Sequence, residues 1–222
     1  MAKSSPNDVT TDFIKAECEA TLYPALCIQC LSSYSTTIQN SHKQLAQAAL
    51  SVSLSRAQST ASFIAKLARI RGLKPIQHRA VRDCLANMAN SADQLSRSVK
   101  ELAGMRDDDF DWHENNVESW VGAALTFENT CLDLFAGPTM DGNVKVAVRR
   151  MVMDCAQVTS NALALVHRYA ARHSTDVASS ETCYNKIIFD LTFIFDEKLN
   201  KRLSIAELGS HCEEYVNDNK LL

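Results

Sequence analysis

The stretch VRDCLANMANSADQLSRSVKELAG, residues 81–104, sets the pattern for most of the chain. Its apolar residues recur at alternating steps of four and three, the spacing of one face of an α-helix. They are Val81, Leu85, Met88, Ala92, Leu95, Val99 and Leu102. Pro75 suits the first turn of this helix, and Gly104 marks its end. The segment therefore predicts a long amphipathic helix from Pro75 to Gly104.

Three further stretches repeat the same rhythm. They cover residues 41–71, 109–137 and 142–172, with Gly72 expected to cap the first and Asp109 or Asp111 to begin the second. The last is expected to end at about Arg172. Four such helices with short links, in a chain with only 6 Gly and 4 Pro, predict an all-α antiparallel four-helix bundle.

The helix expected after Asp109 carries two large aromatic residues, Trp120 and Phe127. A four-three seam through them predicts a buried face made of Val117, Trp120, Ala124, Phe127, Cys131 and Leu134. Because Phe127 falls on this seam, core packing explains it better than recognition of a partner does.

Two segments flank the bundle. Before it, Cys18 and Cys27 stand on either side of the Tyr23-Pro24 break, which predicts a short helical hairpin whose arms a disulfide could join. The expected domains are a hairpin over 12–40, a bundle over 41–172 and a C-terminal extension over 173–222. The extension contains an apolar run from Ile187 to Phe195, which we expect either to pack on the bundle or to limit solubility.

Composition excludes several classes of protein. The net charge is −3, and no Lys/Arg block interleaved with aromatic residues is present, which argues against nucleic-acid binding. No apolar run is long enough to span a membrane. The polar start MAKSSPNDVTTDF lacks the apolar segment of a signal peptide and favours a cytosolic protein, whereas 8 cysteines favour an oxidising compartment.

Chemical sites are poorly supported. The 6 histidines show neither an HExxH motif nor a pair at ligand spacing, so we expect no metal, no cofactor and no catalytic residues. The acidic run 107–114 lacks EF-hand spacing and is typical of helix capping. Cys30 is expected to be an unpaired thiol and Cys155 a buried one. Cys183 and Cys212 can pair with each other, pair with Cys30 or stay free.

Cys84 lies midway along one predicted helix and Cys131 late in the next, so antiparallel packing can bring them within disulfide reach. One cysteine pair in an N-terminal hairpin and one between the second and third bundle helices is the pattern of the plant invertase and pectin methylesterase inhibitor family. Five segments resemble that family in order over residues 12–172: TLYPALCIQCLSSYS (21–35), QLAQAALSVSLSRA (44–57), VRDCLANM (81–88), VESWVGAALTFENTCLDLF (117–135) and MVMDCAQVTSNALALV (151–166).

The resemblance implies a secreted inhibitor with disulfides Cys18–Cys27 and Cys84–Cys131, and a sequence that begins at a mature or truncated end. It implies a one-to-one complex with pectin methylesterase in the plant cell wall (apoplast), in which the bundle covers the pectin-binding cleft. The invertase-type Pro-Lys-Phe motif is not seen. An inhibitor of acid invertase and a non-inhibitory helical scaffold remain the alternatives, whereas a propeptide would need a catalytic domain after residue 172.

The resemblance also implies which positions meet the enzyme. They fall on Ala86, Asn90, Asp93 and Gln94 in the second bundle helix and on Thr130 and Asp133 in the third. Ala86 and Asn90 depart from the acidic residues common in the family. Spacings of four and three along 86, 90 and 93, and along Thr126, Thr130 and Asp133, predict one stripe on each helix. Without the resemblance, these residues are typical of solvated helix faces.

Overall fold

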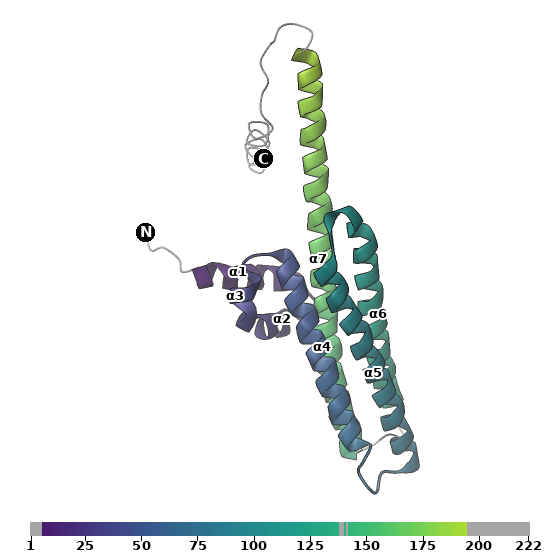
Figure 1. Cartoon of the computed structure of the whole chain (residues 1–222). Coiled ribbons are helices and arrows are strands. Elements are labelled where there is room, and N and C mark those ends of the chain that lie inside the picture. Colours follow the sequence, from purple (N-terminus) through teal and green to yellow (C-terminus); the bar gives the residue numbers. More distant parts are fainter. Residues whose placement is uncertain (1–5, 138–139, 141, 195–222) are drawn as a thin grey trace. The chain divides into compact units, whose positions relative to one another are not determined.

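The computed structural model describes residues 6–137, 140 and 142–194, with side chains from residue 9 to residue 174 except Asp107. Every regular element in these ranges is helical, as predicted (Figure 1). The elements are α1 Pro6–Cys18, α2 Pro24–Leu31, η1 Ser32–Tyr34, α3 Ser35–Ile38, α4 His42–Leu67, α5 Pro75–Gly104, η2 Asp107–Asp109, α6 Phe110–Leu134 and α7 Gly142–Ile194.

Helices α4, α5, α6 and the first half of α7 form an antiparallel bundle (Figure 1). Each contributes fully buried apolar side chains to one core, for example Leu50, Met88, Val121 and Val148. The chain divides into two compact units at residues 169 and 170, and the bundle core belongs to the first. None of the described helices is long and apolar enough to cross a membrane.

Two capping predictions differ from the structure. Helix α4 ends at Leu67 with Ala68 as its C-cap, so Gly72 is not the cap; its φ of +92° serves the turn before α5 instead. Asp109 precedes α6, but its side chain makes no capping hydrogen bond. It lies 3.7 Å from the Arg106 guanidinium. Pro75 opens α5 as predicted.

Helix α7 was predicted to end at about Arg172 and continues to Ile194. No Gly or Pro occurs between residue 143 and the end of this helix, so the chain contains no helix-breaking residue there. The side chains of the apolar run from Ile187 lie outside the described residues, as does Cys212, and the predictions made for them stay untested.

The N-terminal hairpin is held by the predicted disulfide between Cys18 and Cys27, whose Cα atoms are 5.6 Å apart. It is tied to α7 by polar contacts. Arg168 donates to the buried Glu17 carboxylate at 2.7 Å, and the Asn161 amide both donates to and accepts from the Tyr23 backbone.

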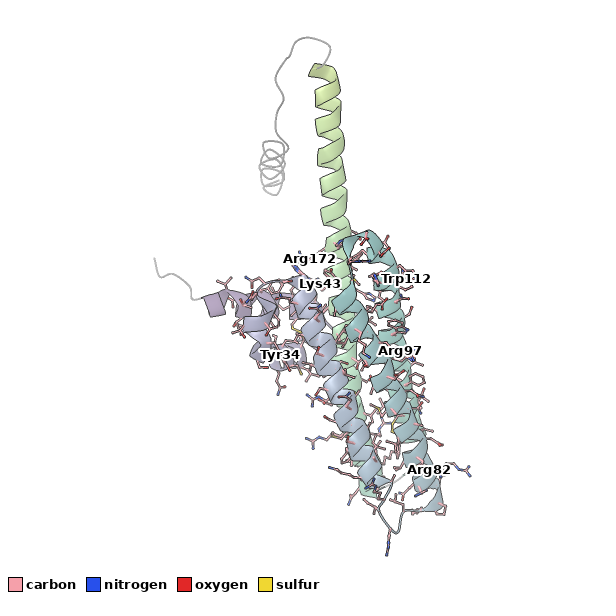
Figure 2. All side chains as sticks on the ribbon, viewed as in Figure 1. Tyr34, Lys43, Arg82, Arg97, Trp112 and Arg172 are labelled. Carbon is pink, nitrogen blue, oxygen red and sulfur yellow. A yellow bond between two sulfur atoms is a disulfide. The ribbon has the colours of Figure 1, made fainter. Side chains whose placement is uncertain are left out.

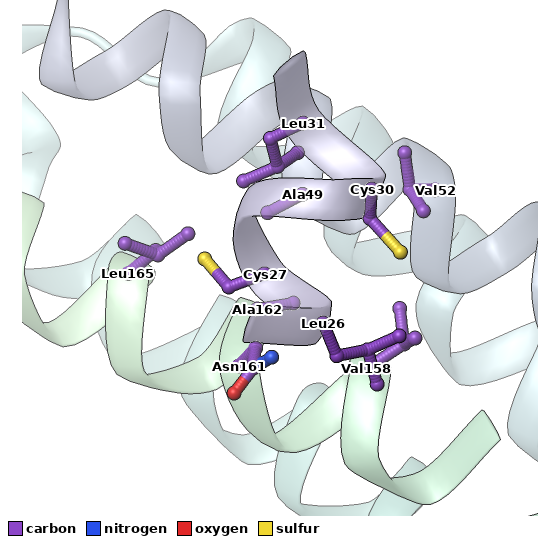
Figure 3. Close-up of a pocket in the computed structure, with 10 residues that line it drawn as sticks. All are labelled: Leu26, Cys27, Cys30, Leu31, Ala49, Val52, Val158, Asn161, Ala162 and Leu165. Atoms are coloured by element: carbon purple, nitrogen blue, oxygen red, sulfur yellow. The ribbon is translucent and has the colours of Figure 1, made fainter. Parts of the chain in front are cut away.

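The space between α2, α4 and α7 is a cavity of only about 10 Å³, room for one water molecule (Figure 3). In this close-up the sulfur atoms of Cys27 and Cys30 point in different directions. Cys27 is bonded to Cys18, and Cys30 is a free thiol as predicted, so the CxxC sequence is not a redox pair.

Candidate functional site

Helices α5 and α6 are locked to each other at two levels. The disulfide Cys84–Cys131 is present, with Cα atoms 4.6 Å apart. Seven residues further along α5, the Ser91 hydroxyl donates to the Glu128 carboxylate of α6 at 2.7 Å. Both links are fully buried, so the outward faces of the two helices are held in a fixed position relative to each other.

The residues predicted to meet an enzyme lie on these outward faces. Asn90 and Asp93 on α5 are exposed, as are Thr126, Thr130 and Asp133 on α6. Gln94 is half-buried, and Ala86 is exposed. We call the outward side chains 86, 90, 93, 94, 126, 130 and 133 the outer stripe. Its two halves lie on α5 and α6, which run antiparallel and side by side in the bundle (Figure 1).

The outer stripe has few internal contacts that restrict it. The Asp93 carboxylate accepts from Arg97, one turn on, at 3.0 Å, and Arg97 marks this part of α5 in Figure 2. The hydroxyls of Thr126 and Thr130 donate to carbonyls one turn earlier, at 3.0 and 2.7 Å. Each hydroxyl oxygen therefore keeps lone pairs that can accept a hydrogen bond from a partner. The surface presents mainly acceptors.

A buried polar cluster lies on the inward side of α5 and α6, opposite the outer stripe. The apolar seam predicted for α6 did not include it. Glu128 is fully buried and its Oε1 atom lies 2.7 Å from Ser91 Oγ, 3.0 Å from Thr159 Oγ1 and 3.4 Å from Cys155 Sγ. The Thr159 hydroxyl lies 2.7 Å from Ser53 Oγ, which adds α4 to the cluster. The cluster of Glu128, Ser91, Thr159 and Ser53 thus connects all four bundle helices.

Burial raises the pKa of Glu128 to about 7, although hydrogen bonds from Ser91, Thr159 and Cys155 act to lower it. Its second oxygen, Oε2, has no hydrogen-bond partner among the described residues. Below neutral pH the carboxyl group is therefore mainly uncharged, which removes most of the cost of burying it.

The predicted seam of α6 was wrong by one residue at three positions. Val121, Glu128 and Phe135 are buried, whereas Trp120, Phe127 and Leu134 are half-buried. Both possible seams pass through Val117, Ala124 and Cys131, and the sequence alone favours the more apolar of them. The hydrogen bonds of Ser91 and Thr159 to the Glu128 carboxylate hold the other seam inward.

Cys155 is a buried thiol as predicted, and burial raises its pKa, so it is a poor nucleophile. Across the residues with placed side chains, no group of three His, Cys, Asp or Glu could hold a metal ion.

Comparison with known proteins agrees with this description. Residues 12–165 match the family described as plant invertase/pectin methylesterase inhibitor. The chain belongs to this family. Membership of an inhibitor family confirms the prediction that the protein is not an enzyme.

Two relatives of the inhibitor family are especially similar. A protein of Daucus carota named "21 kDa protein" is 49% identical over 164 residues, 72% of this chain and 85% of the relative. "Pectinesterase inhibitor 9" of Arabidopsis thaliana is 45% identical over 180 residues, 78% of this chain and 88% of the relative.

A solved structure supports the fold described above for this protein. A mutant form of a pectin methylesterase inhibitor from Arabidopsis aligns with a TM-score of 0.56 and 20% identity, covering 74% of this chain and 97% of that one. The helical bundle is therefore shared despite low identity.

Proposed function

We propose that the protein inhibits a plant pectin methylesterase by covering its pectin-binding cleft with the outer stripe, in a one-to-one complex. The observation that carries the proposal is the 45% identity to a relative named as a pectinesterase inhibitor, over 88% of that relative. The name does not favour the alternative of an invertase inhibitor.

The mechanism is steric exclusion by a preformed surface. Because α5 and α6 are joined by a disulfide and by a buried hydrogen bond, little backbone freedom is lost when a partner binds. The Asp93 and Asp133 carboxylates and the Thr126 and Thr130 hydroxyls supply acceptors for basic and amide groups of the enzyme.

We further propose secretion to the cell wall. Two disulfides close the hairpin and the bundle, and such bonds persist in oxidising compartments. A cytosolic scaffold would keep these four thiols reduced, so counting free thiols in protein isolated from its natural source under alkylating conditions separates the two readings.

The test is a titration of pectin methylesterase activity at mildly acidic pH, with acid invertase titrated in parallel. We expect loss of esterase activity with an endpoint at one equivalent and no loss of invertase activity. Loss of invertase activity alone would select the alternative, and no loss of either by correctly oxidised protein would reject inhibition altogether.

The role of the outer stripe is tested by repeating this titration with variants of the protein. Replacing both Asp93 and Thr130 with Ala should weaken inhibition at least about tenfold, as removal of central interface contacts commonly does. Gln58→Ala on the exposed face of α4 is the control and should leave inhibition unchanged. Equal inhibition by the double variant and the control would show that the enzyme binds elsewhere.

A further inference from the structure

One end of the bundle is strongly basic. No Asp or Glu occurs between Glu19 and Asp83, and Lys and Arg crowd the last part of that interval. We call the Lys and Arg side chains at the α4–α5 turn and the start of α5 the basic end. They are Lys66, Arg69, Arg71, Lys74, Arg79 and Arg82, and all are exposed.

The fold adds further cations beside them. Because the bundle is antiparallel, α4 ends, α5 begins, α6 ends and α7 begins at the same end (Figure 1). The first turns of α7 contribute Lys145, Arg149 and Arg150. Lys145 and Arg149 donate to backbone carbonyls at the end of α6, which places them at this end. In sequence, residues 66–83 and 130–150 hold nine Lys or Arg and three Asp, although the whole chain is acidic.

The charges of the basic end are mostly not neutralised inside the protein. Within the part of the chain that the structure describes, no ion pair joins Lys66, Arg69, Arg71, Arg79 or Arg82 to a carboxylate. Clustered like charges of this kind repel one another and are stabilised by an anionic partner.

The basic end is also hollowed. A cleft of about 390 Å³ is lined by Pro75, His78, Arg79, Arg82 and Asp83 on the first turns of α5. This volume is in the range of sites for small ligands, roughly 300–1,000 Å³, and accommodates a sugar unit. Figure 2 labels Arg82 at this end of the bundle and Trp112 at the other.

We propose that the basic end binds de-esterified pectin, a linear polymer that carries a carboxylate on each unesterified sugar. The choice of polymer rests on the proposed function: removal of methyl esters by the target enzyme creates such carboxylates where the inhibitor acts. No Phe, Tyr or Trp lies between residues 66 and 83, so the surface lacks the aromatic platforms that stack nucleic-acid bases. The protein thereby stays beside the product while the outer stripe meets the enzyme.

The test is binding of the full chain to polygalacturonate at pH 6, by calorimetry or thermophoresis, without any enzyme present. Fully methyl-esterified pectin of the same length is the neutral control. We expect binding to polygalacturonate only, with affinity about tenfold weaker at 200 mM than at 20 mM NaCl, because the contacts are between exposed charges. Equal binding of both polymers, or no binding at low salt, would overturn the proposal.

A matched pair of variants locates the site. R79Q/R82Q should weaken polygalacturonate binding roughly five- to tenfold. The control K100Q/R106Q removes the same charge elsewhere, from the far half of α5 and from the α5–α6 turn. We call this turn, with the exposed Asp108, Asp109 and Asp111, the acidic end. The control should change affinity less than about twofold. Equal losses in the two variants would mean a response to net charge alone, and would overturn the proposal.

Two measurements separate other outcomes. Light scattering at low salt detects binding of the basic end to the acidic end of a second copy. If R79Q/R82Q abolishes this self-association while polymer binding persists, the basic end is an interface between copies of the protein, and the proposal is overturned. Esterase inhibition by R79Q/R82Q on a short soluble substrate should equal that of the unchanged protein. Because the binding assay contains no enzyme, its failure is distinct from failure of the inhibitor function.

Discussion

Helices α5 and α6 carry polar side chains on both their outward and their inward faces, but the two faces have different roles. On the outward face, Asp93, Thr130 and Asp133 are exposed, and the side chains of Asp93 and Thr130 bond within their own helix. On the inward face, Ser91 and Glu128 bond across helices and are fully buried. The polar residue type alone therefore does not indicate a binding role; the direction of the side chain decides it.

This difference gives a simple expectation. Inward substitutions should change the free energy of unfolding, because they leave buried groups without partners. Outward substitutions should change inhibition, because they remove contacts to the enzyme. They should change the free energy of unfolding little, because water replaces the lost contacts within the protein.

The largest effect should come from removing the inward disulfide. With 47 residues between its cysteines, the chain-entropy model gives a loss of roughly 4 kcal/mol of unfolding free energy for Cys84→Ala/Cys131→Ala. Urea denaturation of the oxidised proteins measures it. The control, Cys18→Ala/Cys27→Ala, opens a loop with a separation of only 9 and should lose less, roughly 3 kcal/mol. The reverse order would mean that the hairpin, not the α5–α6 pair, holds the fold.

The next effect is a pH dependence from Glu128. Its pKa is raised by burial from 4.5 to about 7 in the folded state, so folding favours the protonated form. The stabilisation is complete below about pH 4.5 and is lost as pH rises through 7, by roughly 3 kcal/mol at about 1.4 kcal/mol per pKa unit. Urea denaturation at pH 5 and pH 8 should show the loss.

Glu128→Gln is the control for that measurement, because it is uncharged at both pH values. Burial and the neighbouring Glu118 also raise the pKa of Glu114 to about 7, and this contribution has the same sign. The part of the pH dependence that Glu128→Gln removes belongs to Glu128. An unchanged slope in this variant would mean that the buried carboxyl group is solvated at high pH.

A third, smaller effect distinguishes two buried serines on the same face of α5. Ser91 donates to Glu128 across the helix pair, whereas Ser98 donates only to the Gln94 carbonyl of its own helix. Ser91→Ala should lose about 1–2 kcal/mol because it removes a hydrogen-bond donor from a buried carboxyl group. Ser98→Ala should lose less than about 0.5 kcal/mol, since a hydroxyl bonded to its own helix contributes little. Equal losses would make the Glu128 cluster unimportant for stability.

The sequence predicted the bundle because four apolar seams with the same rhythm need one another to be buried. It did not predict Glu128, because burial of a carboxyl group depends on Ser91 and Thr159, which approach from other helices. It did not predict the length of α7 either, because Arg172 carries no stop signal. The positions of the outer stripe came from the family resemblance, and the helix spacing alone would equally describe a solvated face.

The smallest effect on stability is expected on the outward face. Asp93→Ala removes one exposed ion pair with Arg97, which is worth about 0.3–0.5 kcal/mol. Its unfolding free energy should therefore stay close to that of the unchanged protein, while its esterase inhibition weakens. Ser91→Ala, two residues earlier on the inward face, is the natural counterpart and should do the opposite. A loss of more than about 1 kcal/mol of unfolding free energy in Asp93→Ala, with inhibition intact, would show that the outward face is structural. A binding group that is exposed to water makes few packing contacts within its own protein, so its removal should not destabilise the fold.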